Sequence, residues 1–166
     1  MSSSTAEPPV LTAAVVTVSD SSSRGQREDR SGPAVTDLLQ KLHFEVVVSE
    51  VVPDEKIQIQ NLLIRLAREV SFIVTTGGTG LAPRDVTPEA TTAICDRLVE
   101  GVAERMRAEG MKKTPFAALS RGVCGVRGRA LILNLPGSPA GAVDSLEAVA
   151  GLIPHAIALL AGKTEH

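Results

Sequence analysis

Short apolar runs alternate with amphipathic stretches along most of the chain. Residues 10–19, 44–52 and 70–76 are rich in β-branched residues, and the run 130–135 is predominantly apolar. The first run is apolar on successive residues, which is typical of a strand that is covered on both faces. We therefore predict a strand in each run, with a further short extended piece near residues 125–128 just before the last one.

Stretches with helical periodicity separate these runs. We expect helices to begin near Ser31, at Asp54, at Thr87 and near Ser138, with Ser31 and Thr87 as N-caps. Pro88 suits the first turn of the helix that begins at Thr87. This helix is expected to reach about Val99. Further helical segments are expected at residues 101–111 and on either side of Pro154.

Strands that alternate with helices predict parallel crossovers and a sheet between two helical layers. The fold class is therefore α/β: a three-layer α/β/α sandwich with a mostly parallel central sheet. No internal repeat or linker is visible. We expect a disordered tail at residues 1–9 and a single domain at 10–166.

The composition narrows the range of partners. The 166 residues are 43% apolar and 22% charged, with a net charge of −2, which argues against duplex DNA or an anionic membrane as the main partner. Only three aromatic residues are present, so stacking on single-stranded nucleic acid is not expected. We also expect no apolar run of membrane-spanning length, no secretory signal and reduced cysteines, which together predict a cytoplasmic protein.

Unusual residues follow four of the predicted strands. Ser19 and Asp20 come after the first, Asp54 after the second, residues 75–85 after the third and residues 134–139 after the last. In an open parallel sheet the ligand crevice lies beyond the carboxyl ends of the strands. We therefore expect these loops to form one site.

The loop after the third strand carries Gly77, Gly78 and Gly80. Glycines let a ligand approach the backbone and expose consecutive N–H groups, an arrangement that suits phosphate. Neither common nucleotide motif is present, because no Lys-Ser/Thr follows and the glycine spacing is not that of a dinucleotide fold. A tight turn would by itself explain two of the glycines. Hydroxyl donors are added by Thr75, Thr76 and Thr79.

Two aspartates accompany the glycine loop. Asp85 lies within it and Asp54 follows the neighbouring strand. Carboxylates close to phosphate are favourable when Mg²⁺ lies between them. The alternative for Asp54 is an ordinary helix cap, and the alternative for Asp85 is a turn residue.

The last loop, NLPGSP, also allows two interpretations. Gly137, Ser138 and Pro139 could simply turn the chain and cap a helix. Alternatively, Asn134 and the amides of Gly137 and Ser138 form a second wall for an anion or a ring. Arginines that could steer polyphosphate lie at positions 24, 27, 30, 84 and 121.

With these loops assembled, the chain resembles the molybdopterin-binding family that makes molybdenum cofactor, in particular its Mog-type adenylyltransferases and the gephyrin G domain. The long motif after the third strand is the most specific. The matching segments are TVSDSSSRGQREDRSG (17–32), VVPDE (51–55), TTGGTGLAPRDVTPEAT (75–91), LSRGVCGVRG (119–128) and LILNLPGSP (131–139).

The resemblance implies Mg²⁺-dependent transfer of AMP from ATP to the terminal phosphate of molybdopterin, with release of pyrophosphate. It places Asp54 and Asp85 as catalytic residues and magnesium ligands. It further implies a homotrimer and a separate protein that inserts molybdate. The substrate-binding residues that we expect are Ser19, Asp20, Thr75, Thr76, Gly77, Gly78, Thr79, Gly80, Arg84, Glu89, Ser120, Arg121, Asn134, Pro136, Gly137 and Ser138.

Two other functions fit the same residues. The protein could be a non-enzymatic trimeric carrier or scaffold that only binds molybdopterin, or a metal-dependent nucleotide pyrophosphatase. The presence of both aspartates favours the adenylyltransferase. The segment GVRG (125–128) points in the same direction.

Overall fold

A computed structural model describes residue 7 and residues 9–163, so most of the expected N-terminal tail lies outside the described residues. The strands are β1 (Leu11–Val18), β2 (Phe44–Val52), β3 (Phe72–Thr76), β4 (Arg97–Leu98), β5 (Cys124–Arg127) and β6 (Ala130–Leu135). The α-helices are α1 (Asp20–Ser23), α2 (Ser31–Lys41), α3 (Lys56–Leu66), α4 (Thr87–Ile94), α5 (Glu100–Met111), α6 (Pro139–Val149) and α7 (Ile153–Leu160). Two 3-10 turns complete the described chain, η1 (Pro115–Leu119) and η2 (Ala150–Leu152).

All six strands join one sheet in the order β2-β1-β3-β6-β5-β4. The pairs β1–β2, β1–β3 and β3–β6 are parallel, whereas β5 pairs antiparallel with both β6 and β4. The prediction of a mostly parallel α/β sheet is confirmed. The antiparallel part is the hairpin of β5 and β6 together with the short edge strand β4.

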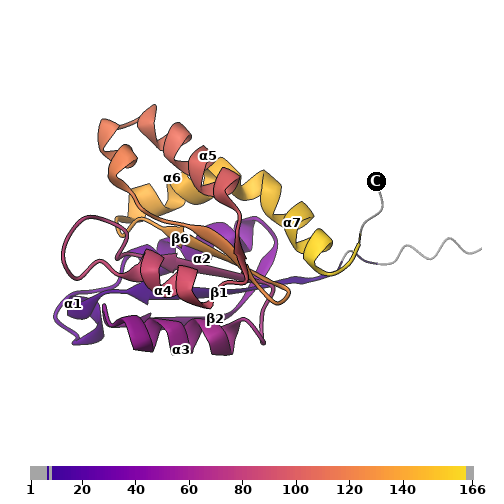
Figure 1. The fold of residues 1–166 in the computed structure, drawn as a ribbon, viewed down its shortest axis with the longest axis horizontal. Coiled ribbons are helices and arrows are strands. Elements are labelled where there is room, and N and C mark those ends of the chain that lie inside the picture. The colour runs from indigo at the N-terminus through magenta and orange to yellow at the C-terminus, as the bar shows by residue number, and fades with distance from the viewer. Residues whose placement is uncertain (1–6, 8, 164–166) are drawn as a thin grey trace, which may run out of the picture.

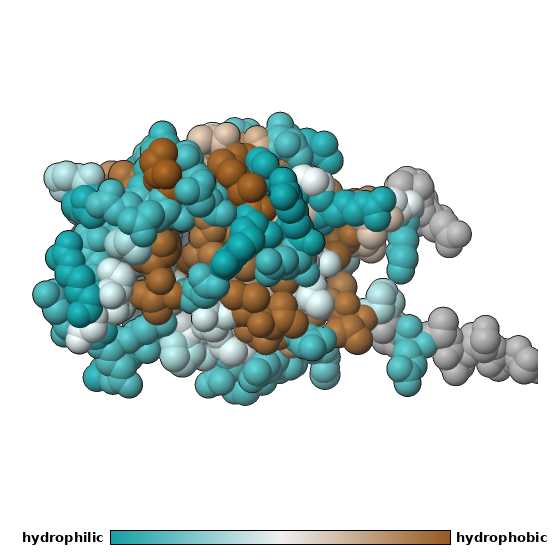
Figure 2. Space-filling model, turned by 90° about the horizontal axis from the view of Figure 1, so that it is seen from below, coloured by the Kyte–Doolittle hydropathy of each residue, from teal (hydrophilic) through white to brown (hydrophobic). Residues whose placement is uncertain are grey.

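Helices cover both faces of the sheet (Figure 1). Apolar side chains of α2, α5, α6 and α7 pack with Val15, Val74 and Leu133 into one core. Those of α3 and α4 pack with Val16 and Ile73 into a second core on the opposite face. Successive residues of β1 and β3 thus point into different cores, which explains why residues 13–16 and 72–74 are apolar at every position. On the α3 side, surface hydrophobic groups are divided into small patches by hydrophilic side chains (Figure 2).

The strand order opens a crevice at the carboxyl ends of β1 and β3. These two strands are neighbours, yet the helix α2 after β1 covers one face of the sheet and α4 after β3 covers the other. The two connections therefore leave the sheet in opposite directions. Ligands bind at such a switch point in open α/β sheets.

Three local predictions were wrong. Ser31 and Thr87 are the first helical residues rather than N-caps, and α4 ends at Ile94 instead of near Val99. The start of α2 is capped from further back, because the Asp29 carboxylate accepts the N–H of Gly32 at 3.0 Å. Beyond α4 the chain turns into the edge strand β4, which pairs with β5.

One stretch of the described chain has the length and composition of a membrane span, contrary to the expectation from sequence. It is Pro139–Leu160, with 22 residues and a mean hydropathy of 1.5. In the fold this stretch is divided into α6, η2 and α7. Its buried residues belong to the core that α2 and α5 also form on one face of the sheet. Those core residues are Ala142, Leu146, Val149, Ile153 and Ile157. Packing within the domain core accounts for these five apolar positions, whereas most of the stretch is not fully buried.

Candidate active site

The third strand ends in a tight turn that only glycine can make. Gly77 and Gly78 have φ angles of 95° and 71°, in the left-handed region. A Cβ on Gly77 would lie 2.4 Å from the carbonyl oxygen of Val18. A Cβ on Gly78 would lie 2.2 Å from Thr87 Oγ1. Both the conformation and the close contacts therefore require glycine.

Three successive amides of this turn are free to bind a ligand. The N–H of Gly77 donates to the carbonyl oxygen of Leu135 at 3.1 Å, so the fold itself uses the first amide. Among the described residues, no hydrogen bond occupies the N–H groups of Gly78, Thr79 or Gly80. All three residues line a cavity. A row of unoccupied N–H groups at a cavity wall is an arrangement that suits an anion.

Asp54 lies against this turn. Its Oδ2 accepts the N–H of Asp20 at 2.9 Å, and its own N–H donates to Asp20 Oδ1 at 3.0 Å. The other oxygen, Oδ1, lies 3.2 Å from where a Cβ on Gly78 would be. Asp54 does not cap α3, whose N-cap position is Glu55 without a side-chain hydrogen bond. The structure thus leaves the capping alternative without support.

Asp85 approaches the same turn from the far end of the loop. Its Oδ2 accepts the N–H of Ala82 at 3.0 Å and lies 2.9 Å from where a Cβ on Gly80 would be. Asp85 also lines the cavity that the free amides face. The two aspartates therefore flank the turn, one beside Gly78 and the other beside Gly80.

The chemistry of these two carboxylates fits a magnesium ion. Burial raises the pKa of Asp54 above its ordinary value, and the negative charges of Asp20 and Asp85 add to the effect. A cation between Asp54 and Asp85 would relieve this repulsion. Within the described chain, no three acidic, histidine or cysteine side chains form a complete metal cage. Mg²⁺ does not need one, since it commonly binds to one or two carboxylates together with substrate phosphates.

Arg84 connects the loops that follow β1, β2 and β3. Its guanidinium donates to both carboxylate oxygens of Asp20, at 2.9 and 3.0 Å, and to Glu55 Oε1 at 2.9 Å. The hydrogen bonds from Arg84 lower the pKa of Asp20. Because Asp20 in turn holds Asp54 through two hydrogen bonds, Arg84 positions the Asp54 carboxylate.

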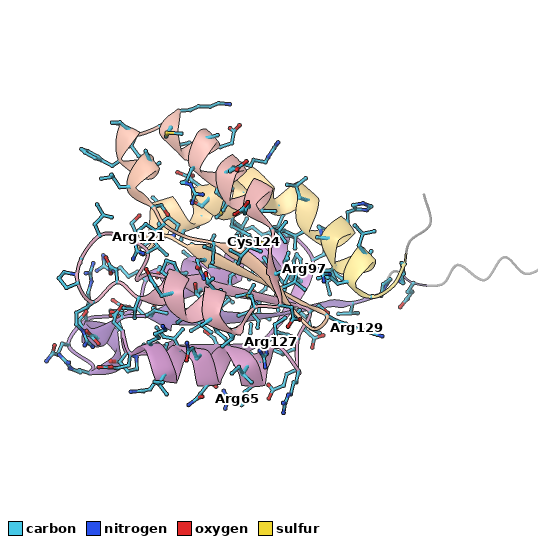
Figure 3. The ribbon with its side chains drawn as sticks, in the orientation of Figure 1. Arg65, Arg97, Arg121, Cys124, Arg127 and Arg129 are labelled. Carbon is cyan, nitrogen blue, oxygen red and sulfur yellow. The ribbon has the colours of Figure 1, made fainter. Side chains whose placement is uncertain are left out.

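Arg121 fixes the other side of the glycine loop. Its Nε donates to the carbonyl oxygen of Gly80 and its Nη2 to that of Asp85, both at 2.8 Å. Its Nη1 forms an ion pair with Glu89, and this contact lowers the pKa of Glu89 although burial opposes the shift. Figure 3 shows Arg121 at the end of the sheet where these loops gather. Arg121 and Glu89 thus hold the loop that carries Asp85.

Asn134 and Thr75 are placed in the protein interior. The Asn134 side chain donates to Thr75 Oγ1 and Thr91 Oγ1, both at 3.0 Å, and accepts the N–H of Val123 at 3.1 Å. All these side-chain groups are buried. Thr76 is also occupied, since its Oγ1 lies 2.8 Å from Ser31 Oγ. These residues join β3, β6 and the helices behind the site, and their hydrogen bonds are made within the protein.

Replacing Asn134 by Ala should therefore destabilise the protein more than it impairs catalysis. The change leaves two buried hydroxyls and one N–H without their partner, and we expect the free energy of unfolding to fall by about 3 kcal/mol. Urea unfolding measures this loss. Turnover per folded molecule should stay near that of the original protein. A large drop in turnover per folded molecule would show instead that Asn134 contacts substrate.

Two cavities flank the glycine turn. The first, of about 500 Å³, extends from the free amides and Asp85 to η1 and the start of α6. The second, of about 410 Å³, lies between the end of β1 and residues 27–31. Gly137 and Ser138 line both. Gly137 touches the turn closely, because a Cβ at this position would lie 3.2 Å from the Cα of Gly77. Gly137 and Ser138 thus form a ridge between the two cavities. A ligand with two parts could occupy both cavities across this ridge.

The remaining predicted residues lie at the walls of these cavities. Ser19 lines the second and caps α1 through its Oγ, which accepts the N–H of Ser22 at 3.2 Å. Ser120 and Pro136 line the first. Ser138 caps α6 by accepting the N–H of Gly141, which confirms the capping interpretation while leaving this residue at both cavities.

Comparison with known proteins identifies the family. The sequence model for a probable molybdopterin binding domain matches residues 14–155. The chain belongs to this family. A molybdopterin adenylyltransferase of Helicobacter pylori is 42% identical over 156 residues, which cover 90% of this chain and 87% of that protein.

Two further relatives extend this comparison. The crystal structure of the molybdopterin biosynthesis enzyme MoaB from Thermus thermophilus has a TM-score of 0.88 and 53% identity, and covers 93% of this chain and 98% of that one. The molybdenum cofactor synthesis protein cinnamon of Drosophila melanogaster is 40% identical over 90% of this chain. The match spans 26% of cinnamon, so this chain corresponds to one part of that longer protein.

Not every segment that resembles the molybdopterin-binding family lies at the site. The GVRG segment forms β5 and the turn into β6, and Arg127 lies away from Arg121, towards the opposite end of the strands (Figure 3). Its Nη1 donates to the carbonyl oxygen of Ile94. Arg127 therefore holds the end of α4 and lines neither of the two cavities at the glycine turn.

Some residues at the cavities were not predicted. Lys113, Phe116 and Asp144 line the first cavity, while Arg27 and Asp29 line the second. Arg27 is one of the loop arginines that the sequence offers for steering polyphosphate, and the structure places it at this cavity. A signal for Asp144 does exist in the sequence, because it follows Ser138 and Gly141 at successive steps of three along α6 and so shares their side of the helix.

Proposed function

We propose that this protein transfers AMP from ATP to the terminal phosphate of molybdopterin. The observation that carries the proposal is the glycine turn with three free amides, flanked by Asp54 and Asp85 and placed between two cavities. The names of the bacterial relatives, molybdopterin adenylyltransferase, support the same reaction. The reaction contributes to molybdenum cofactor biosynthesis.

The reaction is a substitution at phosphorus. A terminal phosphate oxygen of molybdopterin forms a bond to the α-phosphorus of ATP. The bond from that phosphorus to the oxygen bridging to the β-phosphate breaks, and pyrophosphate leaves with the electron pair. Such transfers depend mainly on in-line positioning and on neutralising the phosphate charge.

The protein supplies both requirements through groups that are already in place. The N–H groups of Gly78, Thr79 and Gly80 donate to phosphate oxygens at the crossing between the cavities. Asp54 and Asp85 would hold Mg²⁺, which supplies positive charge that neutralises and orients those oxygens. Arg84 and Arg121 keep the two aspartates in place through the hydrogen bonds of their loops.

The linings suggest which cavity takes which substrate. Phe116, Ala117 and Leu119 give the first cavity an apolar wall that suits a flat pterin ring. Hydroxyl groups together with Arg27 and Arg30 line the second cavity, which suits the nucleotide. The phosphates of both substrates would then meet over the shared ridge of Gly137 and Ser138.

An end-point assay tests this function. Purified protein is mixed with ATP, Mg²⁺ and molybdopterin, and adenylylated molybdopterin and pyrophosphate are measured. We expect both products in equal amounts. Binding of molybdopterin without AMP transfer would instead indicate a carrier, and release of AMP without molybdopterin would indicate a pyrophosphatase. Either result contradicts the proposal. The homotrimer, the cytoplasmic location and the separate molybdate-inserting protein stay predictions, and sedimentation equilibrium would test the first.

A further inference from the structure

The wall of the first cavity contains an ion pair between two residues that are not among the predicted site residues. Lys113 follows α5, and its Nζ lies 2.9 Å from Oδ1 of Asp144 on α6. Both residues line the cavity. An exposed ion pair of this kind contributes little to stability, with a median near 0–1 kcal/mol, so structural support is a weak explanation for it. The reaction described above gives neither residue a role.

The surroundings of this pair are those of a ring-binding site. Phe116 is 75% exposed and Leu119 is 51% exposed, and both line the same cavity. The other two phenylalanines are buried and pack against each other, with ring centroids 5.5 Å apart. An exposed phenylalanine beside a charged pair offers an apolar face and polar groups at once. A flat heterocycle with a polar edge has the complementary shape and chemistry.

We propose that Asp144 and Lys113 recognise the 2-amino-4-oxo edge of the pterin ring. This edge presents two neighbouring donors, the 2-amino group and N3–H, followed by an acceptor, the 4-oxo oxygen. The Asp144 carboxylate accepts both donors in a bidentate manner, and Lys113 Nζ donates to the oxygen. The inference rests on the proposed function for the choice of a pterin as ligand. It adds the residues that select this ring.

Recognition of this kind gives selectivity as well as affinity. A pteridine with a 2-oxo group in place of the 2-amino group puts an acceptor against the Asp144 carboxylate, and two acceptors repel each other. The 4-oxo oxygen is unchanged in that ring, so the contact with Lys113 is kept. The two residues therefore predict different patterns of loss when each is replaced.

The inference is tested by measuring how two pteridine rings bind to the original protein, to two variants of the ion pair and to two control variants. The probes are 6-hydroxymethylpterin monophosphate and the corresponding lumazine, whose 2-amino group is replaced by oxygen, and binding is followed by pteridine fluorescence without ATP or Mg²⁺. The original protein should prefer the pterin by about 10- to 100-fold, as expected for hydrogen bonds to a charged group. Asp144→Asn should reduce this preference to about threefold or less. Lys113→Ala should weaken both rings by a similar factor and keep the preference.

Matched variants control for general effects. Glu147→Gln removes a carboxylate from the exposed side of the same helix, and Lys112→Ala removes the neighbouring lysine, which pairs with Glu109 outside the cavity. Both should bind like the original protein. An original protein without preference for the pterin, or an Asp144→Asn variant that keeps the full preference, overturns the inference.

The inference and the proposed function fail separately. Selective pterin binding without AMP transfer would overturn the proposed function alone. Full AMP transfer without selectivity between the two rings would overturn the role of Asp144 and Lys113 alone. The first measurement uses the original protein, so the outcome does not depend on whether a variant folds.

Discussion

Asp85→Asn is expected to lower the rate of AMP transfer by about 10²- to 10³-fold, the size found when one charge-stabilising group is removed from an active site. The change removes one of two carboxylates beside the glycine turn, and with it half of the proposed protein ligands for Mg²⁺. Binding of the pterin should change only a few-fold, because other residues of the first cavity are the ones proposed to contact the ring. Single-turnover transfer and pteridine fluorescence measure the two effects.

A matched control separates this effect from the loss of any surface charge. Asp37 is exposed on α2 and contributes to none of the cavities at the turn. Asp37→Asn should leave the rate unchanged. Increasing the Mg²⁺ concentration should partly restore Asp85→Asn if its defect lies in metal binding. Near-normal turnover of Asp85→Asn at low Mg²⁺ would remove Asp85 from the mechanism.

Gly78→Ala is expected to abolish measurable transfer and to destabilise the protein. The residue has a φ of 71°, which costs an alanine about 1–2 kcal/mol. The new Cβ would also lie 2.2 Å from Thr87 Oγ1 and 3.2 Å from Asp54 Oδ1. To fit, the turn must move away from both side chains, and the free amides move with it. Thermal unfolding and transfer assays on the same preparation measure the two losses.

The chain contains a control for the backbone part of this effect. Gly128 has a φ of 58° in the turn between β5 and β6, and a Cβ there would meet nothing within 4 Å. Gly128→Ala should therefore lose about 1–2 kcal/mol of stability through backbone strain, with unchanged transfer. If Gly78→Ala behaved in the same way as Gly128→Ala, the close fit of the turn would have no catalytic importance.

The four long strands could be predicted because each is a compact run of β-branched and apolar residues. The edge strand β4 could not. It has two residues, Arg97 and Leu98, both exposed, and its pairing with β5 depends on residues far along the chain. Local sequence there resembles the preceding helix, so the pattern predicts a helix that continues to about Val99. The strand conformation of these residues is set by pairing with a distant strand and not by local propensity.

The meeting of the candidate residues at one edge of the sheet was predictable, but the direction of some side chains was not. Gly78, Asp54 and Asp85 meet because parallel strands end at the same edge of the sheet. Asn134 lies one residue before the end of β6 at that edge too, yet its side chain points into the interior. Every residue of β6 is buried, so the alternation of polar and apolar residues that would reveal the inward face is absent.

The functions of the two clamping arginines also required the structure. In the sequence, Arg84 and Arg121 are loop arginines like Arg24 or Arg30, which have no comparable network in the described structure. Only the fold brings Arg84 to Asp20 and Arg121 to the carbonyl oxygens of the glycine loop. Contacts between residues that lie 36 or more positions apart leave no local pattern.

The most direct measurement is a crystal structure with Mn²⁺ and a non-hydrolysable ATP analogue, recorded at a wavelength where manganese scatters anomalously. Our account predicts one anomalous peak in contact with the carboxylates of Asp54 and Asp85 and with a phosphate oxygen. It also predicts hydrogen bonds from the N–H groups of residues 78–80 to the phosphates. A peak remote from both aspartates, or phosphates bound away from the turn, would contradict it.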